Sequence, residues 1–335
     1  MKSWLLVLAA SVALSGISPR PAQAQPVAPP PSDAAASDGV RRIEISTPSG
    51  RYRVWTRRVG ENPRLKVLLL HGGPAMTHEY LEAFEPYLLR DGIEFYYYDQ
   101  LGAGESDRPK DNALWTIPRY VDEVEQVRKA LGLTRNNFCL FGHSWGGILA
   151  IEYSLKHPKT LKCLIISNMM ASIPAYNAYA RRVLEPMMDP AALAEVKALE
   201  AAGRTDDPRY LEILFPQHYE QHVLRRAAAE WPEPVMRTFS HVNSEIYALL
   251  QGPSELGASG RIATWDRFSD LSRIHVPTLV IGARNDTMDP AHMARMAKRL
   301  PKGRYLYSAQ GSHLAMWDDQ ETYFAGLTAF LKDVE

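Results

Sequence analysis

The sequence predicts an α/β fold with a mostly parallel sheet, helices on both faces and one helical insertion. Short continuous apolar runs recur along the chain, helical patterns alternate with them, and one long interval breaks the alternation. The apolar fraction of 46% is ample for a buried core. Basic and acidic residues number 38 each, so no basic field favours nucleic acid or anionic lipid. A small, locally polar substrate fits this balance.

The apolar runs are short enough and apolar enough to be strands buried on both faces. Before them, RRIEIST and RYRVWTRRV alternate apolar and polar residues around Pro48-Ser49-Gly50, which predicts a β-hairpin. Helices are expected around 79–90, 119–131, 145–156, 291–299 and 321–332. The expected buried strands are Val67–Leu70, Phe95–Tyr98, Phe138–Phe141, Leu164–Ile166, Thr278–Ile281 and Arg304–Leu306.

The interval from Ser167 to Pro277 is far longer than a single crossover between parallel strands requires. It is rich in Ala, Leu, Glu and Arg and is punctuated by prolines, which favours short helices. We therefore expect a core formed by residues 41–170 and 270–335. Residues 171–269 are expected to form a helical cap over one end of the sheet.

The first 24 residues have the pattern of a secretory signal peptide. Lys2 is followed by a short apolar run and by Ala22-Gln23-Ala24, an A-x-A cleavage site. A membrane anchor is disfavoured because the run falls well short of the roughly 20 residues that span a bilayer. Residues 25–40 are rich in Pro, Ala and Ser and predict a flexible linker. The expected location is secreted or periplasmic, without a membrane anchor.

The chain has two cysteines, Cys139 and Cys163, each inside an apolar run that predicts a strand. An oxidising compartment would permit a disulfide, but we expect two buried thiols. No C-x-x-C is present, so neither a redox motif nor a zinc site is indicated.

Gly142-His143-Ser144-Trp145-Gly146 is a G-x-S-x-G between a predicted strand and a predicted helix. This strand–turn–helix context is that of the nucleophile elbow of α/β hydrolases, which predicts that Ser144 is the nucleophile. The glycines are required because side chains would clash in so tight a turn. Haloalkane dehalogenases and epoxide hydrolases are disfavoured, because they have Asp where this chain has Ser144.

The base and the acid should follow the nucleophile in the order Ser, acid, His. His313 lies just after the last predicted strand and is the expected base. Asp286 is the expected acid, because Asp289 precedes Pro290 and has the position of a helix N-cap. His218 and His222 have a spacing that could bind metal on a helix, but a solvated helix face is favoured. No metal or organic cofactor is expected.

The oxyanion hole should consist of two backbone N–H groups. One is that of Trp145, directly after the nucleophile. The other is expected from Gly73, in the loop His71-Gly72-Gly73-Pro74 that follows the third predicted strand.

With these residues placed, the chain from about Ile43 onward resembles the proline iminopeptidase family of serine peptidases. The resemblance rests on HGGP at 71–74, DQLGAGESDRP at 99–109, GHSWGG at 142–147, GPSEL at 252–256 and the loops holding Asp286 and His313. It implies an aminopeptidase in which Glu255 of GPSEL holds the substrate's α-amino group.

Two positions depart from the family pattern. The family usually continues HGGP with Gly, where this chain has Ala75. A second amine-binding glutamate often follows the catalytic Asp, where this chain has Thr287. Glu230 or Glu245 in the cap could replace that missing charge.

The resemblance implies a hydrolase that releases the N-terminal residue, with proline favoured, from short peptides or amino-acid amides, and the signal-like N-terminus predicts that it is exported. A carboxylesterase or lactonase using the same three residues without an amine anchor is the main alternative, and Glu255 is the feature that separates the two. A non-catalytic ligand-binding homologue is disfavoured, because a pure binder does not need all three residues.

Overall fold

The computed structural model describes residues 39–335. The expected signal peptide and most of the expected linker lie outside these residues. Eight strands form one sheet in the order β1-β2-β4-β3-β5-β6-β7-β8. The strands are β1 (Val40–Thr47), β2 (Gly50–Val59), β3 (Lys66–Leu70), β4 (Glu94–Asp99), β5 (Phe138–His143), β6 (Cys163–Ser167), β7 (Thr278–Ala283) and β8 (Gly303–Ser308).

The sheet is antiparallel at one edge and parallel elsewhere. The predicted hairpin is formed by β1 and β2, and β2 also pairs antiparallel with β4. From β4 through β3 and on to β8, all neighbouring pairs are parallel. Because parallel strands end at the same edge of a sheet, the loops that follow them can meet there.

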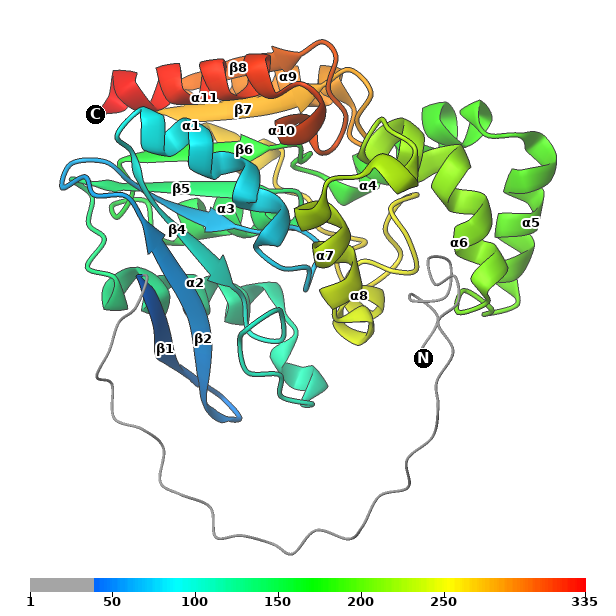
Figure 1. The fold of residues 1–335 in the computed structure, drawn as a ribbon, viewed down its shortest axis with the longest axis horizontal. Helices are drawn as coiled ribbons and strands as arrows, with labels where there is room; N and C mark the ends of the chain where they lie inside the picture. The colour runs from blue at the N-terminus through cyan, green and yellow to red at the C-terminus, as the bar shows by residue number, and fades with distance from the viewer. Residues whose placement is uncertain (1–38) are drawn as a thin grey trace, which may run out of the picture.

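Helices cover both faces of the sheet (Figure 1). Alternate residues of β3 belong to two separate apolar cores. Leu68 and Leu70 pack in the first core, and Val67 and Leu69 pack in the second. The first core is completed by α2 (Ile117–Ala130), α3 (Trp145–Lys156) and α9 (Pro290–Arg299). The second contains α1 (Glu85–Arg90) and α11 (Gln320–Val334). Strands buried on both faces explain why the sequence shows continuous apolar runs.

The segment between β6 and β7 is helical and gathers at one end of the sheet (Figure 1). Its α-helices are α4 (Ile173–Tyr179), α5 (Pro190–Ala201), α6 (Pro208–Leu214), α7 (Glu233–His241) and α8 (Ser244–Leu250). Two stretches, Ala180–Leu184 and Phe215–Val223, are π-helical. Five of these seven elements have a proline at their first or second position, as the prolines of the sequence predict.

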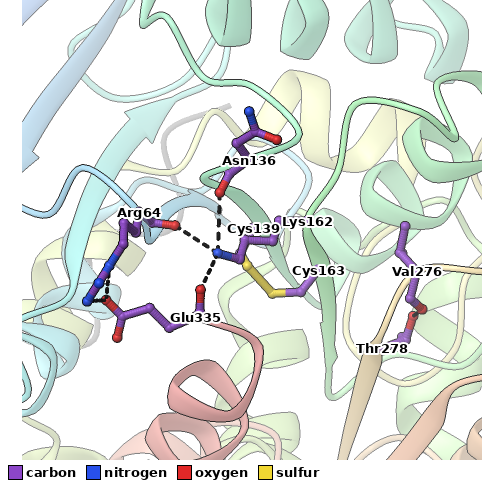
Figure 2. Close-up of a disulfide and its surroundings, with 8 residues drawn as sticks. All are labelled: Arg64, Asn136, Cys139, Lys162, Cys163, Val276, Thr278 and Glu335. Carbon is purple, nitrogen blue, oxygen red and sulfur yellow. Dashed lines mark hydrogen bonds and ion pairs between the residues drawn. A yellow bond between two sulfur atoms is a disulfide. The ribbon is translucent and has the colours of Figure 1, made fainter.

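The two cysteines form a disulfide, so the expectation of free thiols is wrong. Cys139 of β5 and Cys163 of β6 are direct partners in the parallel register, with their Cα atoms 4.5 Å apart. Figure 2 shows the bond beside Lys162, whose ammonium donates hydrogen bonds to the backbone carbonyls of Arg64, Asn136 and Glu335. The sequence could not reveal the pairing, because it does not give the order or register of the strands.

Within residues 39–335, no helix combines the length and the apolar character needed to cross a membrane.

Candidate active site

Ser144 lies between the end of β5 and the start of α3. Its backbone has φ +52° and ψ −124°, which L-residues adopt only under strain. A Cβ at Gly142 would lie 2.1 Å from the Gly146 carbonyl oxygen, and one at Gly146 would lie 2.2 Å from the Leu70 carbonyl oxygen. Only glycine fits at both positions. The turn that the G-x-S-x-G motif predicts is therefore present, with Ser144 at its apex.

His313 and Asp286 come from the loops that follow β8 and β7. His313 Nδ1 lies 2.7 Å from Asp286 Oδ1, and both side chains are buried. The Met288 N–H also donates to Oδ1, at 3.1 Å. Because the carboxylate accepts from Nδ1–H, the other ring nitrogen, Nε2, can act as the base. Burial lowers the pKa of His313, but the charge and hydrogen bond of Asp286, with the charge of Glu255, raise it above its ordinary value.

Asp289 has the structural role that its sequence position predicts. Its carboxylate accepts from the Ala291 N–H at 2.9 Å and caps α9, with Pro290 at the first helical position. It makes no contact with His313 among the described residues. The structure therefore separates the two acids of this loop as the sequence suggested.

The loop after β3 brings Gly73 to the same place as Ser144. Gly73 has φ +112°, and a Cβ there would lie 2.6 Å from the Met76 nitrogen, so the residue must be glycine. The Gly72 N–H donates to the Tyr80 hydroxyl at 2.7 Å. In the described part of the chain, no hydrogen bond engages the Gly73 N–H. The Trp145 N–H lies in the first turn of α3, where N–H groups have no intrahelical acceptor.

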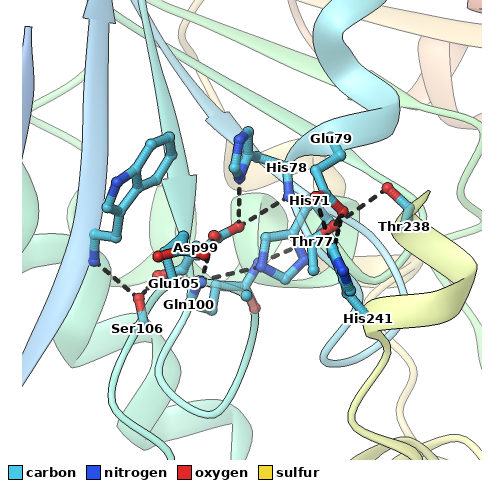
Figure 3. A network of polar contacts seen from close by, with 12 residues as sticks. His71, Thr77, His78, Glu79, Asp99, Gln100, Glu105, Ser106, Thr238 and His241 are labelled. Atoms are coloured by element: carbon cyan, nitrogen blue, oxygen red, sulfur yellow. Dashed lines mark hydrogen bonds and ion pairs between the residues drawn. The ribbon is translucent and has the colours of Figure 1, made fainter. Parts of the chain in front are cut away.

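Gln100, directly after β4, connects this loop to the helix of the elbow. The Trp145 indole N–H donates to Gln100 Oε1 at 2.8 Å, and Gln100 Nε2 donates to the His71 carbonyl at 3.1 Å. The Gln100 backbone N–H also donates to His71 Nε2, at 3.1 Å, a contact drawn in Figure 3. These bonds fix the HGGP loop and the Asp99-Gln100 segment relative to each other.

Ser144, His313, Gly73 and Glu255 line one narrow cavity, whose free volume is about 20 Å³. Glu255 comes from the insertion between β6 and β7 and lines the cavity together with Ser144. The insertion also contributes the cavity residues Val223, Thr238 and Phe239.

Glu255 is surrounded by tyrosines that sequence reasoning did not single out. Tyr247 donates to Glu255 Oε1 at 2.5 Å, and Tyr176 donates to the Glu255 carbonyl at 2.5 Å. The Tyr219 hydroxyl accepts from the Glu255 N–H at 3.2 Å. Burial raises the pKa of Glu255, and the Tyr247 hydrogen bond and His313 partly offset this. No lysine or arginine pairs with Glu255 in residues 39–335. These tyrosines lie on separate helices, so no local sequence pattern links them.

The expectation that His218 and His222 lie on a solvated helix face is wrong, because both are buried. His218 Nε2 donates to the Glu255 carbonyl at 3.1 Å. His222 joins the two loops of the site: its Nδ1 donates to the Asn285 carbonyl at 3.0 Å, and its own carbonyl accepts from the His313 N–H at 2.9 Å. Their spacing reflects packing of the π-helical stretch against the site. Residues 39–335 contain no cluster of three or more His, Cys, Asp or Glu suited to a metal ion.

The structure shows the surroundings of Thr287 and Ala75, the two positions that depart from the family pattern, and of the two acids that could replace the missing glutamate. Thr287 is buried, and its hydroxyl lies 3.2 Å from His313 Nδ1. Glu230 and Glu245 are exposed and do not line the cavity, so neither replaces the missing second acid. Ala75 has φ +57°, a left-handed conformation that glycine adopts without strain.

The fold and the geometry around Ser144 define an α/β hydrolase. Residues 66–320 match the family described as "alpha/beta hydrolase fold". The chain is 56% identical over 295 residues to a proline iminopeptidase of Elizabethkingia meningoseptica, covering 88% of this chain and 98% of that one. It is 55% identical over 292 residues to a proline iminopeptidase of Flavobacterium johnsoniae, covering 87% and 98%. The crystal structure of a Mycobacterium smegmatis proline iminopeptidase superposes with a TM-score of 0.77 at 27% identity, covering 88% and 98%.

The chain belongs to the proline iminopeptidase family of the α/β hydrolases. The resemblance stated from its motifs is thereby confirmed, and the protein is an enzyme of the serine hydrolase class.

Proposed function

We propose that this enzyme is an exported aminopeptidase that releases the N-terminal residue, with proline favoured, from short peptides or amino-acid amides. The observation that carries the proposal is the shared cavity: the Glu255 carboxylate lines the same small space as Ser144 and His313. An aminopeptidase must hold an ammonium group at a fixed distance from the scissile carbonyl. A buried carboxylate does this through a charge-assisted hydrogen bond.

The reaction we propose is acyl transfer in two halves. Ser144 Oγ attacks the carbonyl carbon while His313 Nε2 takes its proton, and Asp286 stabilises the resulting imidazolium. The N–H groups of Gly73 and Trp145 bind the oxyanion. When the intermediate collapses, the C–N bond breaks and His313 returns the proton to the leaving amine. Water then attacks the acyl-enzyme with His313 as base and frees Ser144.

The position of the insertion supports a preference for short substrates. Val223, Thr238 and Phe239 line the cavity from the insertion side, so the space available to the leaving group is limited. We expect kcat/KM to fall sharply as the peptide is lengthened beyond its second residue. Efficient hydrolysis of folded proteins would contradict this part of the proposal.

The decisive experiment compares Glu255→Gln with wild type on prolyl anilide and on a simple acetate ester. Removing one partner of a desolvated charge pair costs about 2–5 kcal/mol, or roughly 30-fold to several thousandfold in kcat/KM for the anilide. Ester hydrolysis should change little, because the ester has no ammonium group. Glu245→Gln, at an exposed acid of the same insertion, is the matched control. Equal losses on both substrates would assign Glu255 a structural role, and no loss on either would favour the esterase.

Export is supported by the signal-like N-terminus and by the disulfide between Cys139 and Cys163, since disulfides persist mainly in oxidising compartments. Mass spectrometry of the protein recovered outside the cytoplasm should find an N-terminus near Gln25. An intact Met1 in a cytoplasmic fraction would contradict export.

A further inference from the structure

Tyr80 and His143 line the cavity beside Ser144 but have no part in the acyl transfer described above. Both side chains are buried, and their rings pack with centroids 5.3 Å apart. His143 directly precedes the nucleophile, and its ring also packs against that of His313 at 4.9 Å. Gly72 is the third member of this group. A Cβ added to Gly72 would lie 3.1 Å from Ser144 Cβ, 3.2 Å from the Tyr80 hydroxyl and 3.3 Å from His143 Nδ1.

The hydrogen bonds among these residues run in one direction only. His143 Nε2 lies 2.9 Å from the His313 carbonyl oxygen, which can only accept, so Nε2 carries the hydrogen. Burial, with the nearby charge of His313, holds the pKa of His143 well below its ordinary value, so the ring is neutral and Nδ1 is an acceptor. The Tyr80 hydroxyl, 2.9 Å away, must then donate to Nδ1. The Tyr80 oxygen in turn accepts from the Gly72 N–H at 2.7 Å.

Three successive hydrogen bonds therefore connect these residues. The Gly72 N–H donates to the Tyr80 oxygen, the Tyr80 O–H donates to His143 Nδ1, and His143 Nε2–H donates to the His313 carbonyl. One end is the loop that presents Gly73, and the other is the backbone of the residue that serves as base. We propose that Tyr80 and His143 are positioning residues, which fix the oxyanion loop and the His313 backbone relative to each other across Ser144. This inference rests on the proposed acyl transfer at Ser144 but not on the preference for an amino group.

Tyr80 is well suited to this role because its backbone is held from two other sides. Its N–H donates to Thr238 Oγ1 at 2.9 Å, and its carbonyl accepts from the Trp317 indole at 2.8 Å. The hydroxyl is thus placed by contacts that do not involve the loop. Removing only the hydroxyl should leave the ring in position and free the Gly72 N–H.

The test is Tyr80→Phe, with Tyr97→Phe as matched control. Tyr97 is equally buried, and its hydroxyl donates to the Leu81 carbonyl without lining the cavity. Hydrolysis of an activated acetate ester should be measured per active site, counted by fluorophosphonate titration. We expect Tyr80→Phe to lower kcat by about 10- to 100-fold, as displacement of an oxyanion donor does, with KM changed by less than about threefold. The affinity of phenylboronic acid, whose serine adduct is tetrahedral, should fall in parallel.

A double-mutant cycle with His143→Asn tests whether the two residues act as one chain. Asparagine keeps a polar atom near Nδ1 but is too short to reach the His313 carbonyl. If both residues act through the same chain, the double variant should be no slower than the slower single variant. Additive losses, or a normal kcat per titrated site in Tyr80→Phe, would overturn the inference. An active Ser144→Ala would instead overturn the proposed reaction.

Discussion

The Asn168 amide donates a hydrogen bond at 2.7 Å to Asp286 Oδ2, the carboxylate oxygen that His313 does not use. The same amide donates to the Ser312 carbonyl at 3.2 Å, next to His313 in the chain. Asn168 follows β6 and has φ +52°, the left-handed conformation that asparagine tolerates better than most residues. One side chain therefore links the loops that carry the proposed acid and the proposed base.

This arrangement predicts different outcomes for two small substitutions at Asn168. Asn168→Gly removes the hydrogen bonds but tolerates the backbone conformation, whereas Asn168→Ala also introduces strain. Both should lower kcat. Alanine should in addition lower the free energy of unfolding by the left-handed penalty of about 1–2 kcal/mol, and so give the lower melting temperature of the two. Thermal denaturation and steady-state kinetics of the pair check this. Normal kcat in both variants would show that Asp286 needs no support from Asn168.

The three residues of the proposed reaction should differ sharply from their neighbour Asp289. Ser144→Ala or His313→Ala should lower turnover by several orders of magnitude while the fold remains intact. Asp286→Asn should be nearly as damaging, because it removes the negative charge that stabilises the His313 imidazolium. Asp289→Asn should be mild, because asparagine can also cap a helix. Circular dichroism of the four variants checks the fold, and ester kinetics measures turnover. A larger loss of turnover in Asp289→Asn than in Asp286→Asn would contradict the assignment of Asp286 as the acid.

The pH dependence of activity should follow His313. The base works only when unprotonated, and Asp286 and Glu255 raise the pKa of His313 above its ordinary 6.5. The acid limb of kcat/KM for an uncharged ester should therefore have its midpoint above pH 6.5. Removing the negative charge in Glu255→Gln should move this midpoint to lower pH. An unchanged or higher midpoint would show that Glu255 does not act on His313 electrostatically.

The disulfide should contribute measurably to stability. It closes a loop with a sequence separation of 24 residues, for which chain entropy predicts about 3 kcal/mol. The double variant Cys139→Ala with Cys163→Ala should lower the free energy of unfolding by up to this amount, measured in urea. Thiol titration of the denatured wild-type protein should find no free thiol without reductant. Two reactive thiols in freshly isolated protein would contradict the bond.

The sequence allowed most of the sheet to be predicted because the inner strands β3 to β7 are buried on both faces and show as apolar runs, whereas the edge strand β8 is only partly buried. It also placed Ser144, Asp286 and His313 in strand-end loops, since the order of these residues and the elbow glycines are local signals. Contacts between separate elements could not be predicted. The cysteine pair depends on the register of β5 and β6, and the burial of His222 depends on where the insertion packs. Tyr80 and His143 meet only in three dimensions, so neither stood out.

The buried pair of Glu255 and Tyr247 has a consequence for the heat of ligand binding. Burial raises the pKa of the Glu255 carboxyl, and no lysine or arginine among residues 39–335 balances its charge. A ligand with a free ammonium group would favour the ionised carboxylate and so lower the pKa of Glu255. At a pH close to that pKa, its binding would therefore release protons to the solvent. Calorimetric titration with proline in phosphate and in Tris at the same pH would then give different apparent enthalpies. N-acetylproline, which lacks the ammonium group, would give no such buffer dependence.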